Sequence, residues 1–414
     1  MPHGLSATFR GSEPIRIDRL TLSNFRNYRE CALDLDAGIT LFQGENGQGK
    51  SNLMEAVYLL AIAKSPRAAS DRELVHWDVA RDGGHAQVAG VAREEELTIR
   101  AQADFQVEPA ADHTQGGSVQ KTLRVNGIQR SAADFVGAFN AVAFSADDID
   151  LVSGPPAVRR RYLDILISQS DPSYLKTLQR YSRVVTQRNH LLRQIRERRA
   201  DAAEMDFWNE RLVSEAVAVI ERRAHAVRKL MEETEPRHAS LSGSGERLEI
   251  AYRPRLRPSN APQGIPADTG QADSFGEGED LRRILHQSLD AVRTREVAQG
   301  VTVVGPHRDE VELKLDGELA GSFSSRGQAR SIALALRLAE AAFVKEATGR
   351  TPVLALDDVL SELDWKRRRL VLEAVAEYEQ TLITITDFDR VGTPFLEEAD
   401  RYVVTGGEVK RAES

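Results

Sequence analysis

The sequence contains a single cysteine, Cys31, among 414 residues. One cysteine excludes an internal disulfide framework and a cysteine-based zinc site, and it suits a reducing compartment. No apolar run approaches the ~20 residues that span a bilayer. Residues 1–14 lack the apolar core of a signal peptide, so we expect them to form a loose tail. These absences favour a cytoplasmic protein with no membrane partner.

An excess of positive charge is also absent. The chain has 55 lysines and arginines against 63 aspartates and glutamates, which gives a net charge of −8. Any contact with nucleic acid must therefore come from a local basic face. With 41% hydrophobic and 29% charged residues, the composition is that of a globular protein long enough for two or three domains.

Residues 44–51 read GENGQGKS, a complete P-loop pattern. The preceding residues 38–43 predict a buried strand, and residues 52–60 predict a helix, which is the context the motif requires. We expect Lys50 to reach the β and γ phosphates of ATP and Ser51 to hold Mg²⁺. The alternative, a chance glycine-rich turn, does not explain this context. The predicted nucleotide-binding residues here are Gly44, Glu45, Asn46, Gly47, Gln48, Gly49, Lys50, Ser51 and Asn52.

Two strands joined by a turn precede the P-loop. The apolar positions of the first strand are Ile15, Ile17, Leu20 and Leu22, and those of the second are Cys31, Leu33 and Leu35. The turn between them, residues 24–28, is polar and aromatic and contains Arg26. Arg26 either contacts the nucleotide or is a solvated arginine in an ordinary hairpin, and the sequence leaves both readings open.

The remaining pattern predicts one nucleotide-binding domain interrupted by a helical one. Strands are expected in 86–100, 119–130 and 142–144, with a surface loop at 104–118. Residues 155–235 have helical spacing, and residues 253–279 are typical of a flexible linker. A helix is predicted at 280–298, a strand at 301–304, a hairpin at 316–317, a helix at 328–347 and strands at 352–356, 381–385 and 402–405. The expected domains are therefore 15–154 with 300–407, an inserted 155–299, and a tail at 408–414.

A local excess of basic residues occurs at the start of the helical region. Residues 157–199 contain eleven, against only Asp164, Asp171 and Glu197. They are a solvated helical face or a surface that contacts a phosphate backbone, and both remain open. The eleven are Arg159, Arg160, Arg161, Lys176, Arg180, Arg183, Arg188, Arg193, Arg196, Arg198 and Arg199.

The second half of the nucleotide site is predicted at residues 353–358, an apolar strand that ends in two carboxylates, as in a Walker B motif. Asp357 is expected to bind Mg²⁺, directly or through water. Asp358 is placed to orient the attacking water, so Asp358 and Lys50 are the candidate catalytic residues. The alternative is a strand that merely ends in a charged turn.

Ser325-Arg326-Gly327-Gln328 precedes the long helix and resembles the signature motif of ATP-binding-cassette proteins. A helix N-terminus with a serine hydroxyl can cap a γ-phosphate. In that class the phosphate belongs to the nucleotide held by the partner subunit. Ser325, Gly327 and Gln328 are therefore further candidate ATP contacts, while a plain capping box of Ser325 and Gln328 is the alternative.

Together these motifs resemble the RecF family of bacterial recombination and gap-repair ATPases. The resemblance covers residues 15–405. The chain has no Cys-x-x-Cys zinc hook and no long heptad insertion, which distinguishes it from SMC proteins and their zinc-hook relatives. The motifs that carry it are residues 24–28, 44–52, 159–164, 305–309, 325–330 and 356–364. The resemblance implies an α/β fold: an ABC-type P-loop ATPase head of mixed β-structure and a parallel sheet, with an inserted, mainly helical lobe.

The same resemblance implies an activity and partners. The family binds DNA, both duplex and single-strand/double-strand junctions, in an ATP-dependent way, and dimerises head to head around two ATP molecules. It hydrolyses ATP slowly as a weak DNA-dependent ATPase, which resets the dimer. It works with RecR and RecO to load RecA, and it supports replication restart and the SOS response to DNA damage.

The chain departs from the cassette pattern at three places. Ser324 stands where leucine is common, residues 384–387 contain no switch histidine, and the Asp147-Asp148 turn has no glutamine. Two other functions remain in competition, a module that drives a membrane-transport or protein partner and a small-molecule phosphotransferase. The basic insertion and residues 305–309 argue against the first, and the signature motif is superfluous to the second.

Overall fold

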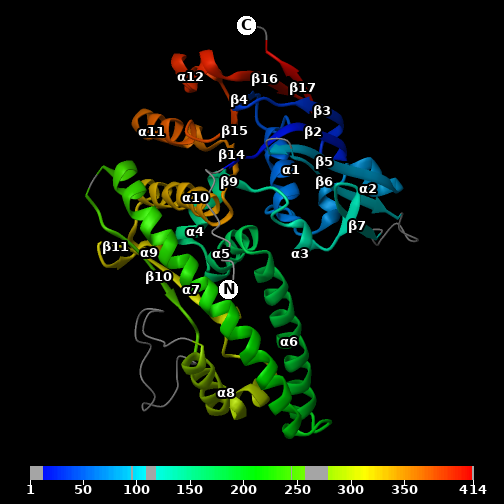
Figure 1. Ribbon diagram of the computed structural model, residues 1–414, viewed down its shortest axis with the longest axis vertical. Helices are drawn as coiled ribbons and strands as arrows, with labels where there is room; N and C mark the ends of the chain where they lie inside the picture. The colour runs from blue at the N-terminus through cyan, green and yellow to red at the C-terminus, as the bar shows by residue number, and fades with distance from the viewer. Residues whose placement is uncertain (1–12, 95–96, 109–117, 244, 257–277, 413–414) are drawn as a thin grey trace, which may run out of the picture. The chain divides into compact units, whose positions relative to one another are not determined.

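The computed structural model describes residues 13–94, 97–108, 118–243, 245–256 and 278–412. The chain divides into two compact units, the first from residues 1–147 and 337–414 and the second from residues 148–336. In Figure 1 the first unit carries the two ends of the colour scale, blue to cyan and orange to red. The second unit is green to yellow. The P-loop pattern at 44–51 and the strand with its two carboxylates at 353–358 thus share the first unit.

A six-stranded sheet forms the centre of the first unit, in the order β17-β16-β4-β15-β14-β9. All neighbours are parallel except β16 and β17. Its interior strands are nearly continuous apolar runs, because a parallel sheet is covered on both faces. The strands are β4 (Gly38–Gln43), β9 (Ala141–Ser145), β14 (Val353–Asp357), β15 (Gln380–Ile385), β16 (Asp400–Thr405) and β17 (Glu408–Arg411).

An antiparallel sheet of six strands, in the order β3-β2-β5-β6-β7-β8, completes the unit. Its strands are β2 (Arg16–Phe25), β3 (Tyr28–Asp34), β5 (Gly84–Glu94), β6 (Leu97–Val107), β7 (Val119–Val125) and β8 (Ile128–Arg130). A short parallel pair joins β1 (Glu13–Pro14) to β13 (Arg350–Thr351). Ile17, Leu20 and Leu22 are buried as their alternation predicts, although a register shift lies between Ile17 and Arg19.

Helix α1 (Lys50–Ile62) packs against strands of both sheets, β9 and β14 in one and β5 and β6 in the other. A helix in that position must be apolar on all sides. Leu59, Leu60 and Ala61 are consecutive, so they point to different sides of the helix, and all three are fully buried. The helix is therefore held rigidly, and so is the P-loop at its N-terminus.

The other helices of the first unit lie around the sheets. They are α2 (Trp77–Asp82), α3 (Ala132–Phe135), α11 (Trp365–Val375) and α12 (Thr393–Glu398), with short 3-10 turns η1 (Asp71–Leu74), η6 (Val359–Glu362) and η7 (Phe388–Arg390). The turn η2 (Ala146–Ile149) and helix α10 (Arg326–Thr348) cross the boundary between the units.

The second unit is mainly helical and is organised around α7 (Met205–Ser242), which packs against α5, α6, α8 and β10. Its helices are α4 (Asp150–Ser153), α5 (Pro156–Ser170), α6 (Pro172–Arg196), α7, α8 (Glu279–Gln299) and α9 (Ala320–Phe323), with turns η3 (Ala202–Glu204) and η5 (Pro306–Arg308). A small antiparallel sheet joins β10 (Leu248–Arg253), β11 (Glu310–Leu315) and β12 (Glu318–Leu319). The predicted α/β class with a helical insertion is confirmed, and no long coiled coil occurs in the described ranges.

The predicted return to the first domain at residue 300 was wrong. Residues 300–336 belong to the helical unit, because β11 pairs along its whole length with β10. The strand predicted at 301–304 is also absent. The backbone N–H groups of Thr302 and Val303 donate instead to the side chains of Asn189 and Glu296, at 2.7 and 2.8 Å. With these donors satisfied by side chains, the segment needs no strand neighbour.

Three predicted loops or tails also differ. Residues 104–107, assigned to a surface loop, continue β6 and pair with β5 and β7, while 109–117 lie outside the described residues. Residues 408–411, assigned to a tail, form β17. Of the predicted linker at 253–279 and tail at 1–14, residues 257–277 and 1–12 lie outside the described residues, and Glu13–Pro14 form β1.

Candidate nucleotide-binding site

The P-loop connects β4 to α1 and needs glycine at two positions for different reasons. Gly49, the N-cap of α1, has φ of 119°, a conformation that side chains rarely adopt. A Cβ atom there would also lie 2.7 Å from Asn27 Nδ2. Gly44 lies so close to β16, the strand beside β4 in the sheet, that a Cβ atom on it would lie 2.4 Å from Val404 O. The loop therefore packs tightly on its outer side and leaves its inner side open.

The turn at residues 24–28 braces the P-loop from outside. Asn27 Nδ2 donates to Gln48 O at 3.0 Å, and the Tyr28 hydroxyl donates to Gly49 O at 3.0 Å. Gln48 is held from the other side as well, because Gly406 N donates to its Oε1 at 2.6 Å. Gln48 is thus occupied in fixing the loop.

Arg26 is not the solvated arginine of one interpretation, and its contact with the nucleotide stays a prediction. Its guanidinium binds Glu55 of α1 in bidentate fashion, at 2.8 and 2.7 Å, and the Glu55 side chain is fully buried. Glu55 also accepts from Ser65 Oγ at 2.5 Å. The guanidinium therefore anchors the turn at residues 24–28 to α1.

A cavity of about 270 Å³ lies on the inner side of the P-loop. Lys50 Nζ donates to Gly44 O at 2.5 Å and to Glu45 O at 2.9 Å. Burial lowers the Lys50 pKa, while the neighbouring carboxylates Asp358 and Asp357 act to raise it. The cavity is lined by Asn46, Gly47, Gly49, Lys50, Ser51, Asn52, Arg67 and Asp358.

Arg67 is the lining residue that the sequence analysis missed. It is exposed in the loop that follows α1, and its backbone N–H donates to Ser65 Oγ at 2.9 Å. Its charge also acts to lower the pKa of Asp357. A basic residue just beyond the P-loop helix is the one signal that could have indicated it.

The two halves of the predicted magnesium site meet directly. Ser51 Oγ donates to Asp357 Oδ1 at 2.8 Å, although the residues lie 306 positions apart in sequence. Thr384 Oγ1 donates to the same carboxylate oxygen at 2.9 Å. Burial raises the Asp357 pKa, and these two hydrogen bonds oppose that shift. A hydroxyl and a carboxylate are the hard oxygen donors that Mg²⁺ prefers, so the residues present fit this ion.

Asp358 stands next to this pair in a fixed conformation. Its φ is 53°, in the left-handed region that aspartate and asparagine tolerate best after glycine. Its backbone N–H donates to Thr384 Oγ1 at 2.8 Å, and its Oδ1 accepts from Ser361 Oγ at 2.5 Å. Thr384, in the stretch that lacks a switch histidine, therefore holds both carboxylate residues in place.

Ser325, Gly327 and Gln328 lie in the other unit, where α10 begins at Arg326. Ser325 N donates to Gln328 Oε1 at 2.7 Å, and Gln328 N donates to Ser325 Oγ at 3.3 Å. This is a capping box, as one of the two readings predicted. Because Ser325 is exposed, the capping box leaves it accessible from outside the chain.

Three of the eleven basic residues in 157–199 serve the interior. Arg188 is 1% exposed and binds Glu296 at 2.6 Å, with Asn209 and Thr302 as further partners. Arg159 binds Glu310 at 3.0 Å. The third is Arg160, which donates to the backbone oxygen of Asp309. The eight that remain exposed are Arg161, Lys176, Arg180, Arg183, Arg193, Arg196, Arg198 and Arg199. A narrower basic surface than predicted is thus available.

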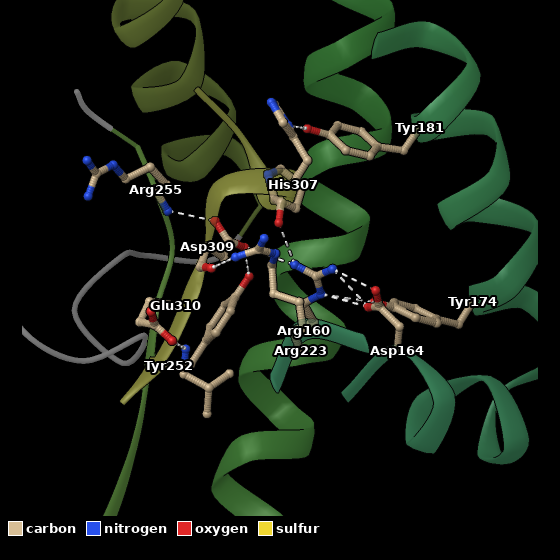
Figure 2. A network of polar contacts seen from close by, with 12 residues as sticks. Arg160, Asp164, Tyr174, Tyr181, Arg223, Tyr252, Arg255, His307, Asp309 and Glu310 are labelled. Atoms are coloured by element: carbon tan, nitrogen blue, oxygen red, sulfur yellow. Dashed lines mark hydrogen bonds and ion pairs between the residues drawn. The ribbon is translucent and has the colours of Figure 1, made fainter. Parts of the chain in front are cut away.

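The motifs at 159–164 and 305–309 meet around Arg223 in the second unit (Figure 2). The Arg223 side chain is buried, with only 3% of its surface exposed. It binds Asp164 at 2.8 Å and Asp309 at 3.3 Å, and it donates to Pro306 O at 2.7 Å. Arg160 donates to Asp309 O at 2.6 Å, and the Tyr252 hydroxyl donates to Asp309 Oδ2. These two motifs therefore join α5, α7, β10 and β11 of the unit.

His307 of the same network is half-buried beside Tyr181 (Figure 2) and also contacts Thr302. Its Nδ1 lies 2.5 Å from the Tyr181 hydroxyl and its Nε2 lies 3.1 Å from Thr302 O. A neutral ring that donates from Nε2 and accepts at Nδ1 satisfies both contacts. Burial lowers the His307 pKa to about 4, helped by Arg308, Arg160 and Arg188 and opposed by the Thr302 hydrogen bond.

This depressed pKa predicts that acid destabilises the helical unit. The unfolded chain binds a proton at His307 near pH 6.5 and the folded chain only near pH 4, so stability falls as pH drops through that window. The expected slope is about 1.4 kcal/mol per pH unit. Native-state hydrogen exchange of α7 amides measures it, and His307→Gln should lower the slope by that amount. His190→Gln, on an exposed α6 position, is the control and should leave it unchanged.

Over the described ranges, none of the helices combines the length and apolarity needed to cross a bilayer.

The family model described as RecF/RecN/SMC N terminal domain matches residues 16–404. The DNA replication and repair protein RecF of Chloroflexus aurantiacus is 38% identical over 401 residues, which cover 95% of this chain and 99% of that protein.

Solved structures are similar over the same length. The recombination mediator protein RecF-ATPrS in the RecFOR pathway has a TM-score of 0.83 and 29% identity, covering 97% of this chain and 100% of that one. The corresponding RecF-ATP structure has a TM-score of 0.80 and 29% identity, covering 99% and 100%. The resemblance inferred from the motifs is confirmed, and the chain belongs to the RecF family.

Proposed function

We propose that the chain is an ATP-dependent DNA-binding protein of recombinational repair, which closes as a head-to-head dimer on gapped or junction DNA. The observation that carries this proposal is the cavity that Lys50, Ser51 and Asp358 line beside Asp357. The similarity to RecF-ATP and RecF-ATPrS structures supports ATP as its occupant. The exposed basic residues of α5 and α6 support a contact with the DNA backbone.

The residues of the cavity have separate roles in this proposal. Lys50, now bonded to Gly44 O and Glu45 O, would turn its ammonium to the β and γ phosphates. Ser51 and Asp357 would hold Mg²⁺, which neutralises phosphate charge when bound. Asp358 would orient the attacking water. Ser325 of a second copy would donate to the γ-phosphate and complete the site, so ATP binding and dimerisation are coupled.

In the cell, such a switch would act in the cytoplasm, at single-stranded gaps adjoining duplex. We propose that the ATP-bound dimer helps RecO and RecR load RecA there, and that slow, DNA-dependent hydrolysis of ATP reopens it. Replication restart and the SOS response to DNA damage would both draw on this step. The relatives named for DNA replication and repair, and for the RecFOR pathway, support this assignment.

Fluorescence anisotropy with a short duplex and a gapped duplex tests the proposal. Tight binding is expected with ATP, and weak binding with ADP or with Lys50→Ala. If closure forms ~6 phosphate contacts, log affinity should fall with log salt with a slope of about −5. Lys410→Ala, at an exposed position of β17, is the matched control and should bind DNA as the unaltered chain does.

Two results would contradict the proposal. Binding that is indifferent to nucleotide would mean that the basic residues form a constitutive patch or a solvated face. The nucleotide site would then have to switch a protein partner. Absence of DNA binding under every nucleotide condition would remove the clamp altogether and favour the transport or partner-switching module.

A further inference from the structure

The first turn of α10 is held by a side chain from outside the helix. Gln328 Nε2 donates to Glu246 Oε1 at 2.6 Å. At its other end the same amide accepts from Ser325 N, with Gln328 Oε1 2.7 Å away. The Gln328 side chain therefore links Glu246 to the residue that precedes the helix.

The carboxylate decides which way the Gln328 amide faces. An ionised carboxylate accepts hydrogen bonds and donates none, so the amide nitrogen must point to Glu246. The amide oxygen then points to the Ser325 N–H, which is the orientation the capping box requires. Without Glu246 the amide is free to rotate and to place its nitrogen against that N–H.

Glu246 itself is held in position by the segment around it. It lies between the end of α7 at Ser242 and the start of β10 at Leu248. The next residue, Arg247, donates from its N–H to Asp316 Oδ1 at 2.8 Å, and its carbonyl accepts from Asp316 N at 2.9 Å. The β11–β12 turn thus clamps the backbone beside Glu246.

The capping box also orients the Ser325 hydroxyl. Ser325 Oγ accepts from Gln328 N at 3.3 Å, which uses a lone pair and leaves the hydroxyl proton to point elsewhere. Because Ser325 is exposed, that proton can be donated to a group on another molecule. A phosphate oxygen is a suitable acceptor at a helix N-terminus.

The second carboxylate oxygen, Glu246 Oε2, is buried and has no hydrogen-bond partner among the described residues. An unsatisfied buried oxygen is destabilising, typically by about 1–3 kcal/mol. Glu246 is therefore poorly placed to serve stability alone, whereas its other oxygen meets the requirement of the capping box. Its removal should leave the fold intact.

We propose that Glu246 is a positioning residue for the signature motif. Through Gln328 it fixes the first turn of α10 so that the Ser325 hydroxyl faces outward, ready to donate to the γ-phosphate held by a second copy of this chain. The inference rests on the proposed function for that last step. The tether between Glu246 and α10 is a property of the single chain and can be tested without nucleotide.

Hydrogen exchange of the amides of residues 325–329 in the nucleotide-free full chain tests the tether. Glu246→Ala should speed their exchange by roughly five- to tenfold, the effect of losing a cap. Glu246→Gln keeps an acceptor oxygen and should restore protection to within about twofold. Glu249→Ala, a neighbouring carboxylate on β10 that lies 3.6 Å from Arg247, is the matched control.

Light scattering with ATP then tests the consequence. Glu246→Ala should bind ATP as the unaltered chain does but raise the dimer dissociation constant by roughly 25-fold or more, because a dimer contains two such contacts. Glu246→Gln should rescue dimerisation. Equal exchange in Glu246→Ala and the unaltered chain would overturn the tether.

Faster exchange with unchanged dimerisation would overturn the positioning role alone. An unaltered chain that stays monomeric with ATP would contradict the proposed function, and the positioning role with it.

Discussion

Replacing Asp358 with asparagine is expected to slow ATP hydrolysis by about 10²- to 10⁴-fold, the range for loss of a general base. ATP affinity should stay within about threefold of the unaltered chain, since only a step after binding is affected. The variant should therefore accumulate as an ATP-bound dimer. Single-turnover hydrolysis, together with light scattering of the same sample, measures both effects.

The substitution is a clean test because of the backbone at this position. Asp358 has φ of 53°, and asparagine tolerates that conformation as well as aspartate does. An asparagine Oδ1 can still accept from Ser361 Oγ, which binds Asp358 at 2.5 Å. Asp364→Asn is the matched control, because Asp364 Oδ1 caps α11 through Arg367 N at 2.9 Å and asparagine caps equally well. Equal hydrolysis by the Asp358→Asn and unaltered chains would exclude Asp358 as the base.

Replacing Arg223 with methionine is expected to destabilise the helical unit by about 3–5 kcal/mol, the cost of leaving a buried partner charge uncompensated. Arg223 is 3% exposed, and the Asp309 side chain that it binds is fully buried. Burial already raises the Asp309 pKa, and without Arg223 it should rise further. Hydrogen exchange of α7 amides at pH 7 measures the loss of stability.

Arg222→Met provides the control one residue away on the same helix. Arg222 binds Asp171 at 2.7 Å, but both side chains are about a third exposed, at 35% and 36%. Such a surface pair contributes at most about 1 kcal/mol. The loss in Arg223→Met should also shrink as pH falls, because protonation of Asp309 in the folded chain then relieves the unpaired charge. Similar effects of the two substitutions would contradict the assigned role.

The sequence predicts best where a motif encodes its own backbone. Gly49 is required by its own backbone conformation, and Ser325 with Gln328 forms a capping box within one turn of helix. The strands at 353–356 and 381–385 were predictable because a buried parallel strand is a continuous apolar run. In each case the information lies within a few consecutive residues.

The errors lie where a side chain's partner is remote in sequence. Arg188, one of the eleven basic residues in 157–199, is buried against Glu296 on α8 and is not available to a ligand. The residues next to Arg188 in the sequence carry no sign of such a partner. The false strand at 301–304 has the same origin, because the side chains of Asn189 and Glu296 replace the strand neighbour that its valines suggested.

The order of strands in the parallel sheet has a consequence for folding during synthesis on the ribosome. β4 lies between β15 and β16, and among the described strands β9 pairs with β14 alone. Each strand from the first part of the chain can therefore pair only after a strand from the last part has been synthesised. Ser51 is made 306 residues before Asp357. At a synthesis rate of about 5–20 residues per second, roughly 15–60 s pass between the synthesis of the P-loop and that of Asp357. A chain that stops before β14 therefore lacks Asp357, the residue that Ser51 contacts, and the strands that flank β4 in the sheet.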